Sequence, residues 1–496
     1  MAFLNELAQL VPQQTPVANF VLGFIGLLVL RFVYTAIRSP LASIPGPLLS
    51  RWTDIHVRIK LLSGSKARYV HSLHEKYGPV VRLGPHEVDV ADVSGAREIH
   101  KVRSKYLKDP GFYVGGKVRS LFSTLDPAFH AQRKRTLDKC FAETSMVELE
   151  PAVIRKAHFT ISKIENEMKT KGCADILHWW TLFAMDIISE LCFGESFQML
   201  EIGKKNQYAK DIAVMGSLLP LRGAFPTLIW LAAYLPLFPE LRDVGIMRQR
   251  IVEYGIKRTD KYLQLVEDGG AKRTLFSSLV HKVGSQNEEL SREDITTEAQ
   301  SYITAGTDTT AVTLTYLIYA VSRQKDVHDR LLREIQALPA EFNHRDLRNL
   351  PYLNCVIDET LRLYGAASGA LPRIVPKEGG QLGGYYVPGG AVVSTQNYTI
   401  HRDEEIFPDP EKFDPSRWET PSSEARNAFM PFGIGSRSCI GINLARLELR
   451  LCTALFFRKF PNVKLSNKFG MTDDEMDPHV NFLAMPAGHR CLIEVV

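Results

Sequence analysis

The stretch FGIGSRSCIG, Phe432 to Gly441, places a cysteine just before a helical pattern that runs from Asn443 to Phe457. Gly433 and Gly435 allow the backbone to turn tightly, so that a sulfur and several N–H groups can approach one point. The positive end of the following helix favours a thiolate at Cys439 over a thiol. The pattern therefore predicts a ligating or reactive cysteine rather than a small buried side chain.

Composition excludes several other kinds of protein. The seven cysteines are an odd number and form no CxxC pair, which argues against a disulfide framework and against a zinc ribbon. The folded part is therefore expected to face a reducing compartment. The net charge of +5 is spread along all 496 residues, so the sequence shows no basic cluster that would indicate nucleic-acid binding.

An apolar stretch near the N-terminus, Pro16 to Ile37, has the length of about 20 residues that a helix needs to cross a bilayer. A cleaved signal peptide would carry its basic residues before a shorter apolar run, whereas Arg31, Arg38 and Arg51 lie within or after this one. We expect a retained single-pass anchor with a cytoplasmic body. This gives an anchor over 1–38, a proline-rich hinge over 39–50 and one catalytic domain over 51–496.

The body is mostly helical by its periodicity, and strand-like runs are short. Residues 79–93 alternate around Gly84 like a hairpin, and residues 384–395 do the same around Pro388 and Gly389. The predicted fold class is mainly α with small β-sheets. An apolar patch at 226–239 is too short to span a membrane, and core packing and contact with the bilayer face are equally good interpretations.

Two further helical motifs carry chemical groups. Glu359 and Arg362 lie three positions apart, on one helical face, and can bond each other. Residues 305–310, AGTDTT, put weak helix formers in the middle of a helix, which is typical of a functional segment. A threonine there can draw a carbonyl away from its helical partner and open a groove for water.

The FxxGxRxCxG pattern at 432–441, the ExxR pattern at 359–362 and AGTDTT resemble the cytochromes P450. The resemblance runs from Pro45 to the C-terminus. It implies the cytochrome P450 fold, preceded here by an N-terminal transmembrane helix. It also implies a haem b cofactor whose iron takes Cys439 as its axial ligand, with Phe432 and Gly441 beside it, and a thiolate there promotes O–O cleavage.

The resemblance assigns further roles residue by residue. Arg437 and Arg373 match propionate donors, and His130 and Lys134 stand where many members have Trp and Arg, so the donor at that edge stays open. Gly306 would leave room for O2 and substrate, and Asp308 and Thr309 would relay protons for oxygen activation. Arg417, in FDPSRW, would join Glu359 and Arg362 in a buried network.

The resemblance also suggests a substrate pocket. Its residues are mostly apolar or small, which favours a terpenoid or polyketide intermediate over a charged metabolite, although core packing selects the same residue types. The residues of several motifs are most similar to those of fungal P450 monooxygenases of secondary metabolism. The named candidates are Phe112, Tyr113, Tyr302, Ile303, Ala370, Leu371 and Phe482.

No GxGxxG segment stands between a strand and a helix, so the chain has no evident flavin or nicotinamide domain. Electrons from NADPH would come from a separate NADPH–cytochrome P450 reductase, with cytochrome b5 as a further candidate partner. The expected location is the endoplasmic reticulum membrane, in contact with lipid. The expected reaction is monooxygenation of an apolar small molecule with O2.

Three alternatives stay open. A P450-like isomerase or dehydratase would work without a reductase, and a non-catalytic haem-binding sensor would perform no turnover. Neither has a use for Asp308 and Thr309. A soluble relative of nitric-oxide reductase would lack the anchor.

Overall fold

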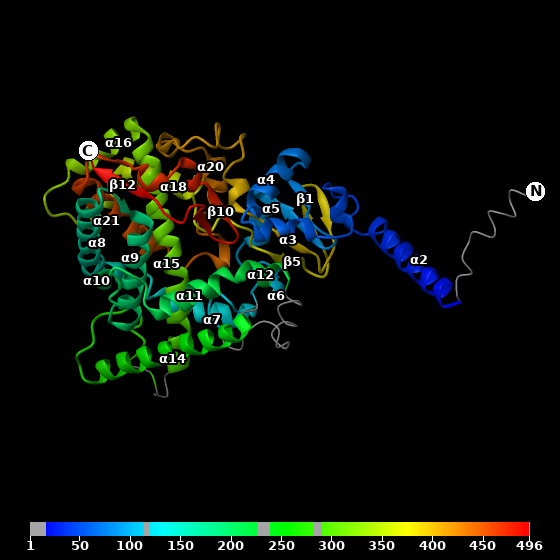
Figure 1. Ribbon diagram of the computed structural model, residues 1–496, viewed down its shortest axis with the longest axis horizontal. Helices are drawn as coiled ribbons and strands as arrows, with labels where there is room; N and C mark the ends of the chain where they lie inside the picture. The colour runs from blue at the N-terminus through cyan, green and yellow to red at the C-terminus, as the bar shows by residue number, and fades with distance from the viewer. Residues whose placement is uncertain (1–15, 114–118, 226–238, 281–282, 284–289, 496) are drawn as a thin grey trace, which may run out of the picture.

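The computed structural model describes residues 16–113, 119–225, 239–280, 283 and 290–495. Helices dominate these residues, which confirms the mainly α prediction (Figure 1). The α-helices are α2 Pro16–Ile37, α3 Ile55–Leu62, α4 Lys66–Tyr77, α5 Val93–His100, α6 Pro110–Tyr113, α7 Pro127–Asp138, α8 Glu143–Lys171, α9 Ile176–Phe193, α10 Met199–Ile202, α11 Gln207–Ser217, α12 Leu219–Ala224, α14 Pro239–Glu267, α15 Arg292–Arg323, α16 Lys325–Gln336, α17 His344–Arg348, α18 Pro351–Leu363, α19 Asn397–Ile400, α20 Ser423–Ala428 and α21 Ile442–Lys459.

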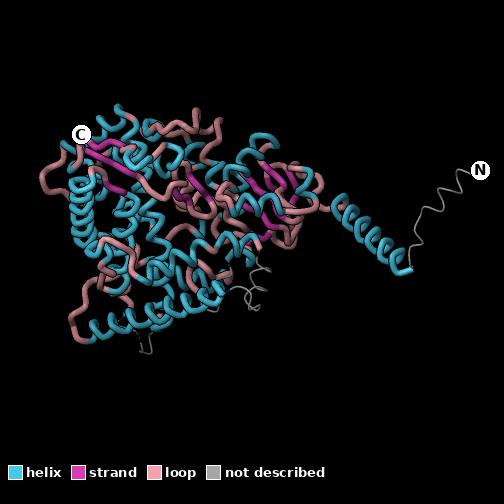
Figure 2. Tube along the Cα trace, viewed as in Figure 1, coloured by secondary structure: helices cyan, strands magenta, loops and turns pink. Residues whose placement is uncertain are grey.

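The strands are short and gather toward the side of the body that faces α2 and toward the C-terminus (Figure 2). The largest sheet has the order β1-β2-β8-β5-β3, and three smaller ones have the orders β4-β12-β9, β6-β7 and β10-β11. The strands are β1 Val80–Arg82, β2 Glu87–Val90, β3 Leu107–Lys108, β4 Ala174–Asp175, β5 Arg373–Ile374, β6 Gly380–Leu382, β7 Tyr385–Val387, β8 Val392–Ser394, β9 Val463–Leu465, β10 Pro478–Val480, β11 Ala484–Pro486 and β12 Leu492–Val495.

One predicted hairpin is confirmed and the other is wrong. β1 and β2 pair antiparallel across the turn at Gly84. In the second region β7 pairs with β6 instead of with β8, and β8 runs parallel to β2. The competing turn is Gly383-Gly384, where both residues have positive φ, at 50° and 85°. Such a glycine pair suits a two-residue hairpin turn and outcompetes the Pro388 turn that we predicted.

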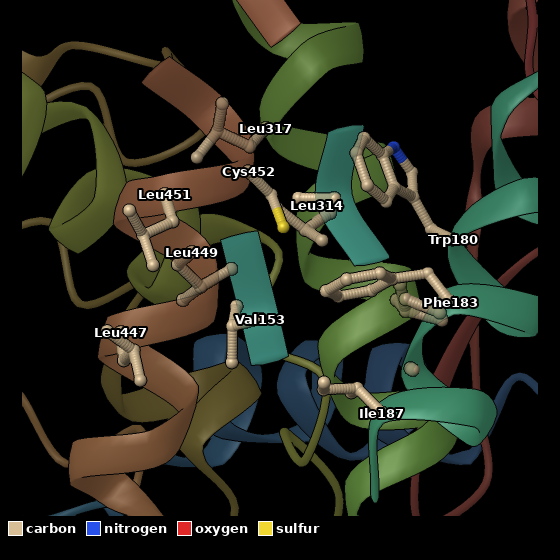
Figure 3. Packing of buried hydrophobic residues seen from close by; sticks show 14 of the residues in the cluster. Val153, Trp180, Phe183, Ile187, Leu314, Leu317, Leu447, Leu449, Leu451 and Cys452 are labelled. Carbon is tan, nitrogen blue, oxygen red and sulfur yellow. The ribbon is translucent and has the colours of Figure 1, made fainter. Parts of the chain in front are cut away.

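The core lies between α8, α9, α15 and α21, whose buried side chains form one continuous cluster. In Figure 3, Trp180 and Phe183 of α9 point toward Leu314 of α15, and Cys452 of α21 lies beside them. α9 is apolar on nearly every face, which is typical of a helix surrounded by others. Among the described residues it is the one helix long and apolar enough to cross a bilayer, yet it is almost wholly buried in the body.

The N-terminal helix α2 projects away from the body, and its apolar side chains between Phe20 and Ile37 are mostly exposed (Figure 1). Within the part of α2 whose side chains are described, the apolar stretch covers Phe20–Tyr34. The segment that follows is not free: Leu41 and Ile44 are buried against the large sheet. The patch predicted at 226–239 lies outside the described residues except for Pro239, where α14 begins.

The segment after α2 is held by Arg82 of β1. The Arg82 N–H donates to the carbonyl of Pro45 at 2.8 Å, and its guanidinium donates to Ser39 Oγ at 3.2 Å. A Cβ built on Gly46 would lie 2.5 Å from the Arg82 carbonyl oxygen, so only glycine allows this approach. Residues 39–47 therefore lie against the sheet.

Candidate functional site

The cysteine loop is a tight turn that leads into α21. Gly433 and Gly435 have φ of 65° and 66°, and a Cβ on Gly435 would collide with the backbone oxygen of His100. The Cys439 N–H donates to the Phe432 carbonyl at 2.8 Å, which closes the loop. Both glycines are thus required by the backbone path.

Cys439 is accessible to solvent-sized molecules, whereas every other cysteine among the described residues is buried. Burial nevertheless raises the pKa of the Cys439 thiol, while the backbone N–H of Gly441 and the charge of Lys134 lower it. The Cys439 residue is therefore accessible although protein surrounds most of it. Gly441 and Lys134 partly offset the effect of burial on this pKa.

Basic side chains crowd beside this loop. Burial and the nearby Arg373 lower the pKa of Arg437 to about 10. Burial and the charges of Arg437, Lys108 and Lys134 lower the pKa of His130 to about 3. Four expected propionate donors therefore lie close enough for their charges to interact. We call them the basic cluster: Arg437, Arg373, His130 and Lys134. Such a cluster suits an anionic group.

Individual contacts hold these side chains in place. Arg373 donates to Tyr113 OH at 2.8 Å, and Arg437 donates to the Thr124 carbonyl at 3.1 Å. Lys134 donates to Ser438 Oγ at 3.0 Å and so braces the cysteine loop itself. A cavity adjoins the cluster and is lined by His100, Leu371, Arg373, Thr395, Asn397, Met430, Gly433, Ile434 and Arg437.

Lys108 is a member of the cluster that the sequence reasoning missed. It lies opposite Arg373 in the β3–β5 pair, and burial together with Arg437 and Arg373 lowers its pKa to about 6. Its ammonium lies 4.3 Å from the centre of the Tyr113 ring. No local pattern marks Lys108, because its position depends on strand pairing with a residue far away in the chain.

The middle of α15 is partly exposed. Thr304 and Ala305 are exposed although the residues after Thr309 are almost all buried. Thr309 donates its hydroxyl to the Ala305 carbonyl at 2.7 Å. Burial raises the pKa of Asp308, and the charge of Lys205 lowers it. Asp308 and Thr309 thus lie next to the open stretch, and Lys205 is a neighbour that the motif did not reveal.

Three further residues of α15 were expected at the site, and the structure shows their surroundings. A Cβ on Gly306 would lie 3.4 Å from Ile188 of α9, which is an ordinary contact distance, and the expected room for O2 at Gly306 stays a prediction. Tyr302 packs on Phe141 with ring centres 5.1 Å apart, and Ile303 is fully buried. Both side chains are buried, whereas Thr304 and Ala305 are exposed, and the pocket role of Tyr302 and Ile303 stays a prediction.

A second link connects α15 to α21. Thr310 donates to Glu448 Oε2 at 2.9 Å, and burial raises the pKa of the Glu448 carboxyl to about 8. α21 begins three residues after Cys439, so this bond ties the helix that follows the cysteine loop to the helix that carries Asp308 and Thr309. The sequence reasoning did not single out Glu448.

Glu359 is fully buried and accepts two hydrogen bonds from Arg362, both at 2.8 Å. Arg417 approaches the same carboxylate at 3.4 Å. Two donors missed by the motif, Trp418 Nε1 at 2.9 Å and the backbone N–H of Asp414 at 2.8 Å, complete its coordination. The carboxylate is therefore saturated by donors from two segments of the chain.

The remaining pocket candidates lie together. Phe112 contacts Tyr113 and Phe482, with ring centres 4.8 and 5.5 Å away. Phe122, which was not predicted, contacts Tyr113 at 5.6 Å and Phe482 at 6.1 Å. Ala370 and Leu371 are half-buried and run beside β8 and the turn that carries Phe482. We call Phe112, Tyr113, Phe122 and Phe482 the aromatic wall.

The residues present fit an iron porphyrin. Among the described residues there is no group of three or more His, Cys, Asp or Glu side chains that could hold a metal ion. A porphyrin supplies four ligands to its iron itself and needs only one or two from the protein, which a single cysteine can provide. The strained basic cluster beside the cysteine loop suits the porphyrin's carboxylates.

Comparison with known proteins agrees with this arrangement. The family model described as cytochrome P450 matches residues 45–489. Cytochrome P450 monooxygenase tazI of Aspergillus terreus is 44% identical over 472 residues, covering 94% of this chain and 96% of the relative. Cytochrome P450 monooxygenase orf2 of Aspergillus niger is 41% identical, with 99% and 100% covered. Cytochrome P450 monooxygenase stcB of Emericella nidulans is 36% identical, with 92% and 88% covered.

Proposed function

Because this chain belongs to the cytochrome P450 family, an oxidoreductase family with a haem cofactor, we propose that it inserts one atom of O2 into an apolar small molecule and reduces the other to water. The observation that carries the proposal is the accessible Cys439 with a basic cluster beside it and Asp308 and Thr309 on the helix tied to α21. When bound, the haem supplies the iron that activates O2.

Cys439 would hold the iron as a thiolate, and two groups of the chain partly offset the cost of burying that charge. The Gly441 N–H and Lys134 both favour the ionised sulfur. Phe432, half-buried beside the loop, and Gly441 shape its surroundings. Arg437, Arg373 and Lys108 bind the haem carboxylates, and His130 completes this edge. Lys134 serves mainly to brace the loop through Ser438.

Asp308 and Thr309 transfer protons. Burial raises the pKa of Asp308, which makes it a better proton carrier than an exposed carboxylate, and Lys205 offers it a charged neighbour. The Thr309 hydroxyl, bonded to the Ala305 carbonyl, can reorient toward the open stretch of the helix and pass a proton on. Glu359, Arg362 and Arg417 have a structural role and fix α18 to residues 414–418.

The electrons come from NADPH through a separate cytochrome P450 reductase, with cytochrome b5 as a further donor. α2 anchors the chain in the endoplasmic reticulum membrane in a single pass, with the catalytic domain, residues 51–496, in the cytoplasm. The apolar exposed side chains of α2 and the basic residues Arg31 and Arg38 support this. Contact with lipid lets an apolar substrate reach the body from the bilayer.

The substrate is an apolar intermediate of fungal secondary metabolism, a terpenoid or a polyketide. Fungal monooxygenases among the relatives and the aromatic wall with Leu371 support this class. We expect the substrate to carry few polar groups, because the pocket candidates present aromatic rings and no charge. These candidates are Phe112, Phe122 and Phe482.

The test is to produce the full chain with a fungal reductase in membranes and to record the ferrous carbon-monoxide spectrum. Terpenoid, polyketide and polar scaffolds are then screened for displacement of the iron-bound water, and products are identified by mass. We expect a thiolate-type spectrum, shifts with apolar scaffolds and NADPH-dependent hydroxylated products. A normal spectrum with no turnover in the presence of reductase would favour an isomerase or a sensor.

A further inference from the structure

The aromatic wall has one member on a turn between α6 and α7. Phe122 lies in the turn formed by residues 120–124, and its ring is 49% exposed. Its contacts with Tyr113 and Phe482 join that turn to two other segments of the pocket. The position of the 120–124 turn therefore sets how far the Phe122 ring reaches across the wall.

The 120–124 turn is a rigid unit. The Ser120 N–H donates to Ser123 Oγ at 3.0 Å, and the Ser123 N–H donates back to Ser120 Oγ at 3.2 Å. The Thr124 N–H donates to the Ser120 carbonyl at 3.0 Å. These local bonds close the turn on itself, so we expect it to move as one body if its outer contacts are broken.

Three buried or half-buried charged side chains hold the turn, each from a different element and each at a different main-chain group. Glu298 of α15 accepts from the Leu121 N–H at 2.9 Å. Lys108 of β3 donates to the Phe122 carbonyl. Arg437 of the cysteine loop donates to the Thr124 carbonyl at 3.1 Å.

Glu298 differs from the other two. Lys108 and Arg437 belong to the basic cluster, so changing them would also disturb cofactor binding. Glu298 is fully buried on α15 and interacts with Arg133 and Asp294. Its Oε2 and Arg133 Nη1 are both buried without a hydrogen-bond partner among the described residues, and Arg133 is fixed by Asp294 at 2.5 Å. A buried carboxylate with one bond to a neighbouring turn serves to hold that turn.

We propose that Glu298 is a positioning residue that, through the Leu121 N–H, holds the 120–124 turn so that Phe122 narrows the substrate pocket and selects against bulky ligands. The selectivity part rests on the proposed function, because it needs a haem pocket. The clamp on the turn does not, since it concerns only the contact between Glu298 and Leu121.

The test compares Glu298→Leu, which removes the acceptor, with Glu298→Gln, which keeps an oxygen acceptor. Glu293→Gln, an exposed change on the same helix, is the matched control. Hydrogen exchange of the Leu121 amide should accelerate about tenfold or more in Glu298→Leu, less in Glu298→Gln, and not in the control. Unchanged exchange in Glu298→Leu would overturn the clamp.

Selectivity is measured on the haem-loaded protein as the ratio of spectral Kd values for imidazole and for the bulky azole clotrimazole. Glu298→Leu should shift the ratio at least about fivefold in favour of clotrimazole, and it should have no effect in a Phe122→Ala background, because the ring it positions is gone. An equal shift in that background would overturn the role of Phe122. Failure to load haem would count against the proposed function, whereas the Leu121 exchange still tests the clamp.

Discussion

Thr310 donates its hydroxyl to Glu448 on α21, 2.9 Å away, whereas other threonines of α15 donate to the carbonyl four residues earlier. Thr309 and Thr313, on either side, follow that ordinary pattern at 2.7 Å. The exception joins α15 to α21 at a fully desolvated carboxyl group. Because a lone buried carboxylate is costly, this carboxyl is expected to be neutral at pH 7.

The first prediction concerns pH and Glu448. Burial raises its pKa from 4.5 to about 8, so the folded protein binds a proton there that the unfolded chain releases above about pH 4.5. Its contribution to stability is present below that pH and is lost as pH rises toward about 8. Relative to Glu448→Gln, the wild type should lose thermal stability between these values and then level off. Parallel melting profiles of the two proteins from pH 5 to 9 would contradict this.

The second prediction concerns Arg362→Lys. A lysine keeps the charge but cannot donate twice to Glu359 and also reach the His401 carbonyl, which Arg362 contacts at 2.7 Å. We expect a loss of roughly 3–5 kcal/mol in the free energy of unfolding and less haem per chain. Urea unfolding and haem content measure this. Arg426→Lys, an exposed change on α20, should leave both unaltered.

The third prediction concerns Cys439→Ser. The variant should lose the thiolate-type band of the ferrous carbon-monoxide complex, because an alcohol does not ionise to replace the thiolate. Cys355→Ala serves as the control: burial raises the pKa of the Cys355 thiol to about 11, so it stays neutral. A thiolate band that survives in Cys439→Ser but disappears in Cys355→Ala would reverse the assignment.

The fourth prediction separates Thr309 from its neighbour. Thr309→Ala should keep the haem and its spectrum but divert NADPH electrons to hydrogen peroxide, with product per NADPH falling about tenfold or more. Thr313→Ala removes an equivalent helical hydrogen bond, one turn further along α15, and should keep the wild-type ratio. Equal product yields in wild type and Thr309→Ala would remove the proton-relay role while leaving the haem assignment intact.

What the sequence predicted well were features decided by local spacing. The pair Glu359–Arg362 lies within one helical turn, and the tight turn at Gly433 and Gly435 follows from the glycines alone. The donors around Glu359 that come from Asp414 and Trp418 needed the tertiary fold. Lys108 needed the pairing of β3 with β5.

The sequence misled where two local patterns competed, and it left one helix face ambiguous. Gly383-Gly384 and Pro388-Gly389 are both good turns, and only the register of β8 on β2 decides between them. On α15, Tyr302 is buried and Thr304, two positions away, is exposed. The residue types alone do not tell which of the two lines a pocket, so the pocket role of Tyr302 stays a prediction.

The contact between Arg82 and the residues that follow α2 has a practical consequence for cutting the chain. Leu41 and Ile44 cover apolar surface of the large sheet, and Ser39 is a partner of the buried Arg82 guanidinium. A version without α2 should therefore start at Ser39 and not at Arg51. Starting at Arg51 would expose that surface, and the solubility gained by removing α2 would be lost to aggregation.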